Sequence, residues 1–400
     1  MRAVSHFLYG SFCWWLPICL GLGTGAHGET RSEGNLAPFL GSPRFEVRQL
    51  FTGQRFPNVV VTPKGTVLAT WGSKQYQVRR SEDGGNTWEE TIVVASPGFH
   101  GGGVTVDETT GRILLFVEDK HPPARLTVYE SSDDGNTWQP LEVSIRPDSR
   151  GNVPSMHMAE KGITLVHGPK PGRLIRPARV YQGPKGYNTA IFSDDGGRTW
   201  IPSEPFPDEG TGEGAIVELA DGWLYYSSRK HWFPQPPYRH ERLFGWSYDA
   251  GQTWKDLQFS SVLPDGPRYR GLEPRGANYN GHFGMMAGLV RLPVAGRDIL
   301  LYSNADWEGH ERIRLTVWAS FDGGKSWPIK RLVFAGPSAY SSLAAGRPGT
   351  PSEGWIYLLF EGGEKQTYEG GFLARFNLSW VLEGQPTSDG QLPEWAYPPK

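Results

Sequence analysis

Five copies of one eight-residue pattern, Ser-x-Asp-x-Gly-x-Thr/Ser-Trp, decide how this chain folds. They are Ser81–Trp88 (SEDGGNTW), Ser131–Trp138 (SSDDGNTW), Ser193–Trp200 (SDDGGRTW), Ser247–Trp254 (SYDAGQTW) and Ser320–Trp327 (SFDGGKSW). Each copy has the chemistry of a hairpin turn, because the aspartate accepts backbone N–H bonds, the glycine adopts a positive φ and the tryptophan covers the turn. The copies start 50, 62, 54 and 73 residues apart, which predicts an array of similar β units.

The segments between the octapeptides are typical of short strands and tight turns. The 400 residues include 52 Gly and 33 Pro, with 13% aromatic and only 20% charged residues. Strand-like runs such as Leu126–Tyr129 and Leu315–Trp318 lead into the octapeptides, and we find no amphipathic helical pattern. The sequence therefore predicts an all-β, six-bladed propeller of four-stranded units. Its last blade is expected to combine the segment near Arg44–Val47 with C-terminal strands around Leu373–Leu378.

The charges nearly balance, with 40 Lys and Arg against 42 Asp and Glu and a formal net charge of −2. This balance argues against a basic footprint for nucleic acid or for an anionic membrane surface. The ten histidines show no metal-ligand spacing. We therefore expect no metal and no nucleic-acid partner; we also expect no cofactor and a monomeric protein.

Residues 1–28 are predicted to be a secretory signal peptide. Arg2 is their only formally charged residue, and Phe7–Gly23 is largely apolar. A membrane anchor is the weaker alternative, because a glycine and a proline interrupt this stretch. Cys13 and Cys19 both lie within it, so residues 29–400, expected to form one propeller domain, carry no thiol. We expect the protein to be exported, either secreted or periplasmic, without a membrane span after signal removal.

The octapeptides resemble the Asp boxes, or BNR repeats, of the sialidase-like β-propellers. Most of the mature chain also resembles the exo-α-sialidase (neuraminidase) family. Arg55-Phe56-Pro57 is similar to the family's Arg-Ile-Pro signature, with Phe56 in place of Ile. The resemblance implies that Arg55 is the first of three arginines that bind the substrate carboxylate. The alternative is an ordinary surface arginine that precedes a strand.

A second stretch of this kind runs from Glu213 to Arg229. Asp221-Gly222 lies midway, so a hairpin that turns there brings Glu213 and Arg229 together at its open end. By resemblance, Glu213 is the carboxylate beside the nucleophile and Arg229 is the second arginine, with a structural salt bridge as the alternative. The family pattern selects Arg312 as the third arginine, although Arg314, two residues away, is expected on the same strand face.

The segment Ala339-Tyr340-Ser341-Ser342-Leu343 resembles the family's nucleophile segment. The resemblance implies that Tyr340 is the nucleophile, rather than a partly buried strand tyrosine, and that Glu361 orients the first arginine. These residue types suit a 2-keto sugar acid, because three guanidiniums hold its carboxylate by charge-assisted bonds. A neutral tyrosine deprotonated by Glu213 avoids the repulsion that an anionic nucleophile meets. The nearby positive charge is expected to lower the pKa of the phenol.

One part of the family pattern is missing. The family has a general-acid aspartate in the loop after the first hairpin, whereas Thr70–Gln77 here contains no carboxylate. Proton donation to the leaving group is therefore unassigned, and general acid catalysis typically contributes about 10²–10⁴-fold. His100, Glu118, Asp119 and His157 lie on or near neighbouring loops and are the candidate replacements, although each is more often a residue without such a role.

The sequence thus predicts a retaining exo-α-sialidase that releases terminal sialic or related nonulosonic acid from glycans, glycoproteins or glycolipids. Two alternatives stay open. One is a sialidase-like propeller that binds acidic sugars without turnover, because the general acid is missing. The other is a glycosidase or lyase that acts on a different acidic sugar.

Overall fold

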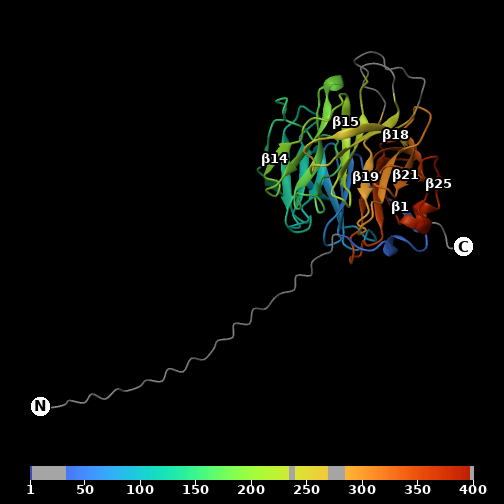
Figure 1. Cartoon of the computed structure of the whole chain (residues 1–400), viewed down its shortest axis with the longest axis horizontal. Coiled ribbons are helices and arrows are strands. Elements are labelled where there is room, and N and C mark those ends of the chain that lie inside the picture. Colours follow the sequence, from blue (N-terminus) through green and yellow to red (C-terminus); the bar gives the residue numbers. More distant parts are fainter. Residues whose placement is uncertain (2–32, 234–238, 269–283, 397–400) are drawn as a thin grey trace.

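The protein is described here by a computed structural model that covers residue 1 and residues 33–233, 239–268 and 284–396. The predicted signal peptide, residues 1–28, lies almost wholly outside the described residues. The fold is all-β and propeller-like, and Figure 1 shows its strands grouped in chain order, from green β14 through yellow β18 to orange β21. Within the described ranges, no helix has the length and apolarity needed to cross a bilayer.

Four of the five sheets each follow one continuous part of the chain. The first contains β2 (Pro57–Val61), β3 (Val67–Gly72), β4 (Tyr76–Ser81) and β5 (Ile92–Ala95). The second contains β6 (Phe99–Val106), β7 (Ile113–Glu118), β8 (Leu126–Ser131) and β9 (Gln139–Leu141). The third contains β10 (Ser144–Ile145), β11 (Ile163–Thr164), β12 (Leu174–Val180), β13 (Tyr187–Ser193) and β14 (Thr199–Pro202). The fourth contains β15 (Thr211–Glu218), β16 (Leu224–Lys230), β17 (Glu241–Ser247) and β18 (Lys255–Pro264).

The fifth sheet has eight strands and joins the two ends of the fold. It contains β19 (Gly288–Arg291), β20 (Leu300–Ala305), β21 (Ile313–Ser320), β22 (Ile329–Ala345), β23 (Ile356–Gly362), β24 (Gly370–Phe376), β1 (Phe45–Thr52) and β25 (Gln385–Pro386). The 17-residue strand β22 pairs with β21 and β25 through its first half and with β23 through its second half. Short 3₁₀ turns lie at Ala37–Phe39, Gly183–Lys185 and Glu394–Ala396.

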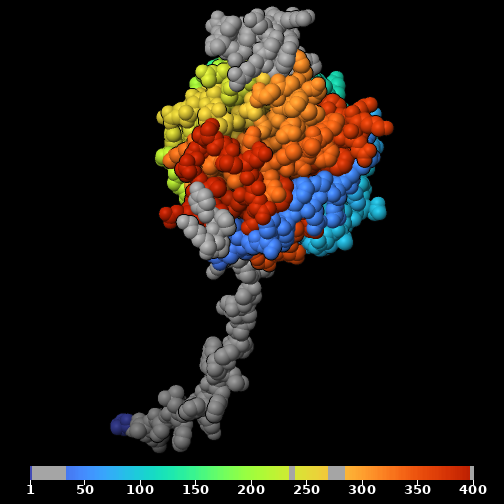
Figure 2. Space-filling model, turned by 90° about the vertical axis from the view of Figure 1, so that its right-hand side faces the viewer, coloured from blue at the N-terminus to red at the C-terminus, as the bar shows by residue number. Residues whose placement is uncertain are grey.

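The N-terminal strand closes against the C-terminal strands, as the sequence predicted. β1 pairs with β24 in antiparallel register, with Phe45 opposite Phe376 and Val47 opposite Ala374. Figure 2 shows the same junction on the surface, where the blue N-terminal residues lie against red C-terminal residues. The closure buries a cluster that joins β2 and β3 to β22–β24 and includes Trp71, Tyr357 and Leu359. Pairing the two ends of the chain removes two sheet edges that would otherwise be exposed.

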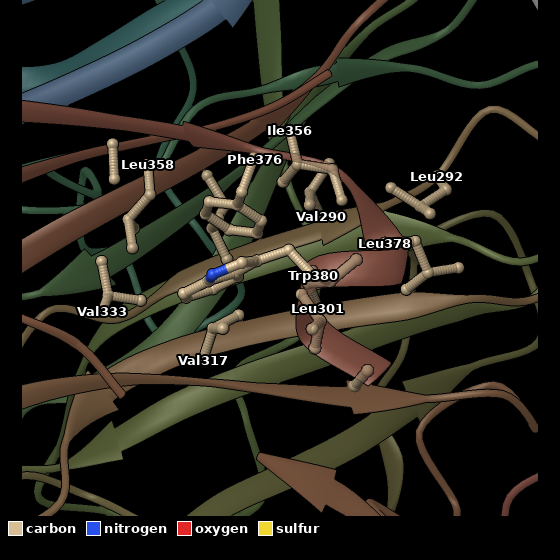
Figure 3. Close-up of a cluster of buried hydrophobic side chains, with 14 of the residues drawn as sticks. Val290, Leu292, Leu301, Val317, Val333, Ile356, Leu358, Phe376, Leu378 and Trp380 are labelled. Carbon is tan, nitrogen blue, oxygen red and sulfur yellow. The ribbon is translucent and has the colours of Figure 1, made fainter. Parts of the chain in front are cut away.

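Another apolar cluster lies between β19–β21 and β22–β24, and it corrects the prediction for the C-terminus. Figure 3 shows Leu301, Val317, Ile356 and Phe376 packed around Trp380. The closing strand ends at Phe376, and a short helix, α1 (Leu378–Leu382), follows it instead of the predicted strand. Asn377 caps this helix by accepting a bond from the backbone N–H of Trp380, a role that suits asparagine at an N-cap.

The octapeptides have the predicted turn geometry. In the first copy, Asp83 accepts bonds from the N–H and the hydroxyl of Thr87, and Ser81 accepts from the N–H of Gly85 at 2.8 Å. The equivalent glycines all have φ between 83° and 88°, a left-handed conformation that favours glycine. They are Gly85, Gly135, Gly197, Gly251 and Gly324.

These turns are expected to be sensitive to acid. Partial burial opposes ionisation of Asp83, but the bonds from Thr87 and Ser81 outweigh it and lower its pKa to about 2. A folded-state pKa below the unfolded value contributes stability above about pH 4 that is lost as pH falls through about 2. We expect Asp83→Asn to lower the melting temperature by about 2 °C at pH 6. The difference should shrink at pH 2.5, and a pH-independent difference in thermal denaturation would contradict this assignment.

Candidate active site

One cavity of about 260 Å³ collects side chains that are far apart in the sequence. The residues that line it come from many parts of the chain, from Arg55, just before β2 of the first sheet, to Tyr340 on β22 of the last sheet. The lining residues are Arg55, Phe56, Phe99, His121, His157, Met158, Arg179, Tyr181, Glu213, Arg229, His231, Arg312 and Tyr340. All five residues predicted for catalysis and carboxylate binding therefore face the same space.

Tyr340, Glu213 and Arg229 form a buried hydrogen-bonded group within this cavity. The Tyr340 hydroxyl donates to Glu213 Oε1 at 2.8 Å, and Arg229 Nη1 donates to Glu213 Oε2 at 2.8 Å. Arg229 Nη1 also lies 3.3 Å from the Tyr340 hydroxyl oxygen. Glu213 is on β15 and Arg229 on β16, so the hairpin brings them together as the sequence predicted. A carboxylate that accepts the phenol proton can act as a general base for that hydroxyl.

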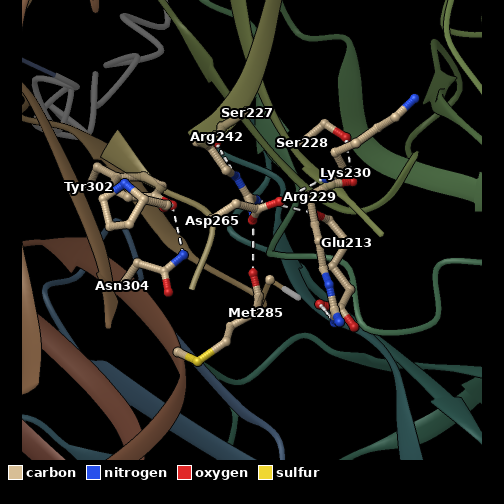
Figure 4. A network of polar contacts seen from close by, with 12 residues as sticks. Glu213, Ser227, Ser228, Arg229, Lys230, Arg242, Asp265, Met285, Tyr302 and Asn304 are labelled. Atoms are coloured by element: carbon tan, nitrogen blue, oxygen red, sulfur yellow. Dashed lines mark hydrogen bonds and ion pairs between the residues drawn. The ribbon is translucent and has the colours of Figure 1, made fainter. Parts of the chain in front are cut away.

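A second buried network fixes the backbone that carries this group (Figure 4). Arg242 donates from Nη2 to the carbonyl oxygen of Glu213 at 3.1 Å and from Nη1 to Asp265 at 2.7 Å. Asp265 also accepts from the backbone N–H of Lys230, the residue after Arg229, at 2.8 Å. Because each charged group has several partners, the ends of β15 and β16 are held in one position.

Glu361 fixes the position of the Arg55 guanidinium by an ion pair. Its Nε and Nη2 donate to the two oxygens of Glu361 at 3.0 and 3.1 Å, a bidentate pair. Glu361 is completely buried and also accepts from the backbone N–H groups of Phe56 and Tyr340. One carboxylate therefore ties the first arginine to the phenol-bearing strand. Phe56 has φ of 76°, a strained conformation for a non-glycine residue of the kind found at functional sites.

Arg312 lines the cavity and Arg314 does not. Arg312 precedes β21 and donates to the Tyr368 hydroxyl at 3.2 Å and to the carbonyl oxygen of Gly284 at 3.1 Å. The expectation that Arg314 shares its strand face is wrong. The register of β21 against β22 shifts between Ile313 and Leu315, and Arg314 has φ of 63°, so the two-residue alternation breaks there.

Arg179 is a fourth cavity guanidinium that sequence reasoning missed. It lies on β12, 2% exposed, and its Nε and Nη2 have no hydrogen-bond partner among the described residues. Its guanidinium lies over the Tyr181 ring at 4.5 Å. The signal available in the sequence was a pair of arginines, Arg176 and Arg179, within the otherwise apolar run Leu174–Val180, because a charge in a buried strand needs a partner or a ligand.

The four candidate proton donors have different positions. His157 lines the cavity, and Glu118 lies behind it, with Oε2 2.8 Å from His157 Nδ1. His100 is completely buried outside the cavity lining, and Asp119 accepts from the backbone N–H of Arg125.

The loop that lacks the expected carboxylate is closed on itself. Gln54 Oε1 accepts from the backbone N–H groups of Ser73, Lys74 and Gln75 at 3.3, 3.1 and 2.8 Å. No acidic side chain enters the cavity from this loop.

Comparison with known proteins shows to which family the chain belongs. Residues 70–351 match the family described as the BNR repeat-like domain. The chain belongs to this BNR-repeat family. It is 30% identical to a sialidase from Micromonospora viridifaciens over 370 residues, which covers 84% of this chain and 53% of that protein. It is 24% identical to a sialidase from Bacteroides fragilis over 320 residues, covering 68% and 54%. The chain thus spans about half the length of these relatives.

The fold of this BNR-repeat protein is also similar to solved sialidase-type structures. The intramolecular trans-sialidase from Ruminococcus gnavus, solved in complex with oseltamivir carboxylate, superposes with a TM-score of 0.63 at 17% identity. The match covers 84% of this chain and 96% of that one. At this identity the similarity shows the fold alone.

The electrostatics of the BNR-repeat site set the protonation states of Tyr340 and Glu213. Burial, and then the charge of Glu213, raises the pKa of Tyr340 to about 12, although Arg229, Arg312 and Arg55 act in the opposite direction. The arginines thus lower the pKa of the phenol, as expected, but burial and Glu213 outweigh them and the net shift is upward. Burial also acts to raise the pKa of Glu213, but Arg229 and Arg179 outweigh it and the pKa is lowered. The resting site holds a neutral phenol beside an ionised base.

Proposed function

We propose that this protein is a retaining exo-α-sialidase, which releases terminal sialic acid or a related nonulosonic acid from glycoconjugates. The observation that carries this proposal is the hydrogen bond between Tyr340 and Glu213, in a cavity that also collects Arg55, Arg229 and Arg312. We also propose that β22 is shared by two blades of the eight-stranded sheet, which gives six blades in all. The expectation of export continues to rest on residues 1–28.

The arrangement suits a sugar whose anomeric carbon carries a carboxylate. Three guanidiniums bind that carboxylate by charge-assisted hydrogen bonds. Glu213 takes the phenol proton as the Tyr340 oxygen bonds to the anomeric carbon and the bond to the leaving oxygen breaks. Water then attacks the same carbon and loses one proton, which balances the proton that the leaving oxygen gains, while the bond to Tyr340 breaks and the phenol is restored by the proton that Glu213 held. Two displacements at one carbon give net retention of configuration.

A neutral nucleophile fits the charges of both substrate and site. A carboxylate nucleophile placed here would face the substrate carboxylate at close range and be repelled. The raised pKa of Tyr340, about 12, keeps the phenol neutral until Glu213 accepts its proton. Substrate binding places an anion among the arginines. Deprotonation of Tyr340 must therefore occur together with its attack on the anomeric carbon and not before it.

Hydrolysis of an aryl sialoside tests the proposal. Purified protein is expected to release the aryl group and free sialic acid, because an activated leaving group needs little protonation. Saturable binding of sialic acid without turnover would instead support the non-catalytic binding protein, which the carboxylate-free loop between β3 and β4 favours. Turnover of uronic or ketodeoxy acid glycosides alone in the same panel would support the third alternative.

Arg312 and Arg314 provide a matched pair of variants. Arg312→Ala is expected to weaken binding of an unsaturated sialic acid analogue by about 10- to 100-fold, because it removes charge-assisted bonds to the carboxylate. Arg314→Ala, two residues away and outside the cavity, is expected to change the affinity by less than about twofold. Isothermal titration with the analogue measures both. Equal effects of the two substitutions would refute the role proposed for Arg312.

A further inference from the structure

We propose that His157, held by Glu118, is the proton donor to the leaving group in place of the missing aspartate. This proposal rests on the sialidase function proposed above. His157 is the catalytic residue in this account, because its ring faces the cavity, and Glu118 is a positioning residue that acts through it. The proposal requires three things: a ring nitrogen available to a substrate, a proton on the pair near neutral pH, and proximity to the phenol.

The position of His157 in the wall of the cavity meets the first requirement. Its Nδ1 is bound to Glu118 Oε2 at 2.8 Å, and the imidazole is otherwise buried. Its Nε2 has no hydrogen-bond partner among the residues that the structure describes, and the ring lines the cavity. Nε2 is therefore the ring nitrogen that can bond to a ligand. The hydrogen bond at Nδ1 sets this role, because the partner of one ring nitrogen decides what the other can do.

A series of packed aromatic rings connects His157 to Tyr340. The His157 ring stacks on Phe99, with centroids 5.4 Å apart and planes 13° apart. Phe99 in turn contacts Phe56 at 5.0 Å, and Phe56 contacts Tyr340 at 6.0 Å. The acid and the nucleophile thus line the same small cavity with two phenylalanine rings between them along its wall. A glycosidase needs this separation, because the sugar lies between the nucleophile and the donor.

Glu118 is fixed so that it holds the imidazole in one orientation. It lies at the end of β7, its Oε1 accepts from the Ser155 hydroxyl at 3.0 Å, and it is 4% exposed. Ser155 Oγ also accepts from the backbone N–H of His157 at 3.0 Å. One serine thus ties the Glu118 carboxyl to the backbone of His157, and the bond from Glu118 to Nδ1 limits rotation of the ring.

The protonation of the pair meets the second requirement. Burial raises the pKa of Glu118 to about 8, and burial lowers the pKa of His157 well below its usual value. Both directions place one proton between the carboxyl and Nδ1 at neutral pH, with a second on Nε2. The charged or titratable groups coupled to the pair are Arg179, His121, Asp119, His100, His231 and Glu213.

The proposed proton transfer balances. The Nε2 proton goes to the leaving oxygen as its bond to the anomeric carbon breaks, and the proton held on Glu118 moves to Nδ1. The pair is left with an ionised Glu118 and a neutral imidazole whose Nε2 lone pair faces the cavity. In the second displacement, Nε2 takes a proton from the attacking water and the Nδ1 proton returns to Glu118. The pair ends as it began.

Two other histidines line the cavity but are less suited to this role. His121 is exposed, its Nδ1 lies 3.1 Å from the carbonyl oxygen of Pro122, and no carboxylate among the described residues bonds to its ring. His231 is buried near Arg229 and Arg179, and burial followed by these charges lowers its pKa well below the usual value. His121 packs edge-on against the His157 ring at 4.7 Å, which makes it the appropriate control.

The test compares His157→Asn and His121→Asn on two sialosides, one with an aryl leaving group of low pKa and one with a sugar as leaving group. His157→Asn is expected to lower kcat/KM for the sugar-linked substrate by about 10²–10⁴-fold and for the aryl substrate by less than about tenfold. His121→Asn is expected to change both by less than about tenfold. In the wild type, activity on the sugar-linked substrate should fall as pH rises and the pair loses its proton, and this limb should be absent in His157→Asn.

Each other outcome has a definite meaning. Equal losses on both substrates in His157→Asn, or leaving-group dependence in His121→Asn, would overturn the assignment to His157. A wild type that hydrolyses neither substrate overturns the proposed sialidase function, and this proposal with it. Retained affinity of His157→Asn for an unsaturated sialic acid analogue shows that the site is folded. If this variant does not fold, Glu118→Gln is measured instead, and it should also lose more on the sugar-linked substrate.

Discussion

Replacing Tyr340 by phenylalanine is expected to lower kcat for an aryl sialoside by about 10³-fold or more, because no covalent intermediate can form. The substitution removes one hydroxyl from a buried ring and leaves the arginines, Glu361 and the aromatic wall in place. Affinity for an unsaturated sialic acid analogue should therefore change by less than about tenfold. Steady-state kinetics and titration of the same preparation separate the two effects.

The stereochemistry of any residual turnover gives an internal control. The wild type is expected to release the α-anomer first, because two displacements retain configuration. In Tyr340→Phe, water must attack directly, so residual product should have the inverted configuration. Nuclear magnetic resonance of the first product distinguishes the two. Retention in the variant would mean that another group acts as the nucleophile.

Replacing Glu213 by glutamine is expected to have the next largest effect, on both catalysis and stability. Loss of the base that accepts the Tyr340 proton should lower kcat by about 10²–10⁴-fold. The same change leaves the buried Arg229 without its counter-charge, and breaking such a pair typically costs about 3–5 kcal/mol. Glutamine keeps the volume of the side chain, so a cavity does not contribute to the loss.

The pH dependence of stability isolates the effect of Glu213→Gln on the folded state from its effect on catalysis. Burial acts to raise the folded-state pKa of Glu213, but the charges of Arg229 and Arg179 outweigh it, so the pKa is lowered. Its contribution to stability is therefore present above the ordinary glutamate pKa and is lost as pH falls below it. The difference in melting temperature between wild type and Glu213→Gln should be large at pH 7 and smaller in acid. A difference that grows in acid would contradict the ionised state assigned to Glu213.

The parts of the fold that depend on local chemistry could be predicted from the sequence. Each octapeptide carries its own turn, because the serine, aspartate and glycine bond to one another within eight residues. The pairing of Glu213 with Arg229 followed from one hairpin with a recognisable turn. The closure of β1 on β24 followed from the incomplete last unit of the repeat.

The features that depend on how deeply a side chain is buried, or on breaks in regular secondary structure, could not be predicted from the sequence in this way. The register shift that separates Arg312 from Arg314 leaves no mark in the alternation of residues. Helix α1 has five residues, which is too short for a helical period to be visible. The raised pKa of Tyr340 and the buried position of Arg179 depend on how far strands from different sheets enclose the cavity.

The convergence of distant side chains was expected only through resemblance to a family. Nothing in the local sequence places Arg55, before β2, beside Tyr340 on β22, almost three hundred residues later. The structure brings them together because β1 and β24 close the fold and Glu361 bonds to both segments. The pairing of His157 with Glu118 likewise requires the second and third sheets to meet at one end.

The most direct test of this account is mass spectrometry of the protein after reaction with a fluorinated sialosyl donor that forms a glycosyl-enzyme quickly and releases it slowly. We predict one added sialosyl group on the peptide that contains Tyr340 and none in Tyr340→Phe. An unmodified protein that still turns over the donor, or an adduct on a different residue, would contradict the claim that this phenol attacks the anomeric carbon.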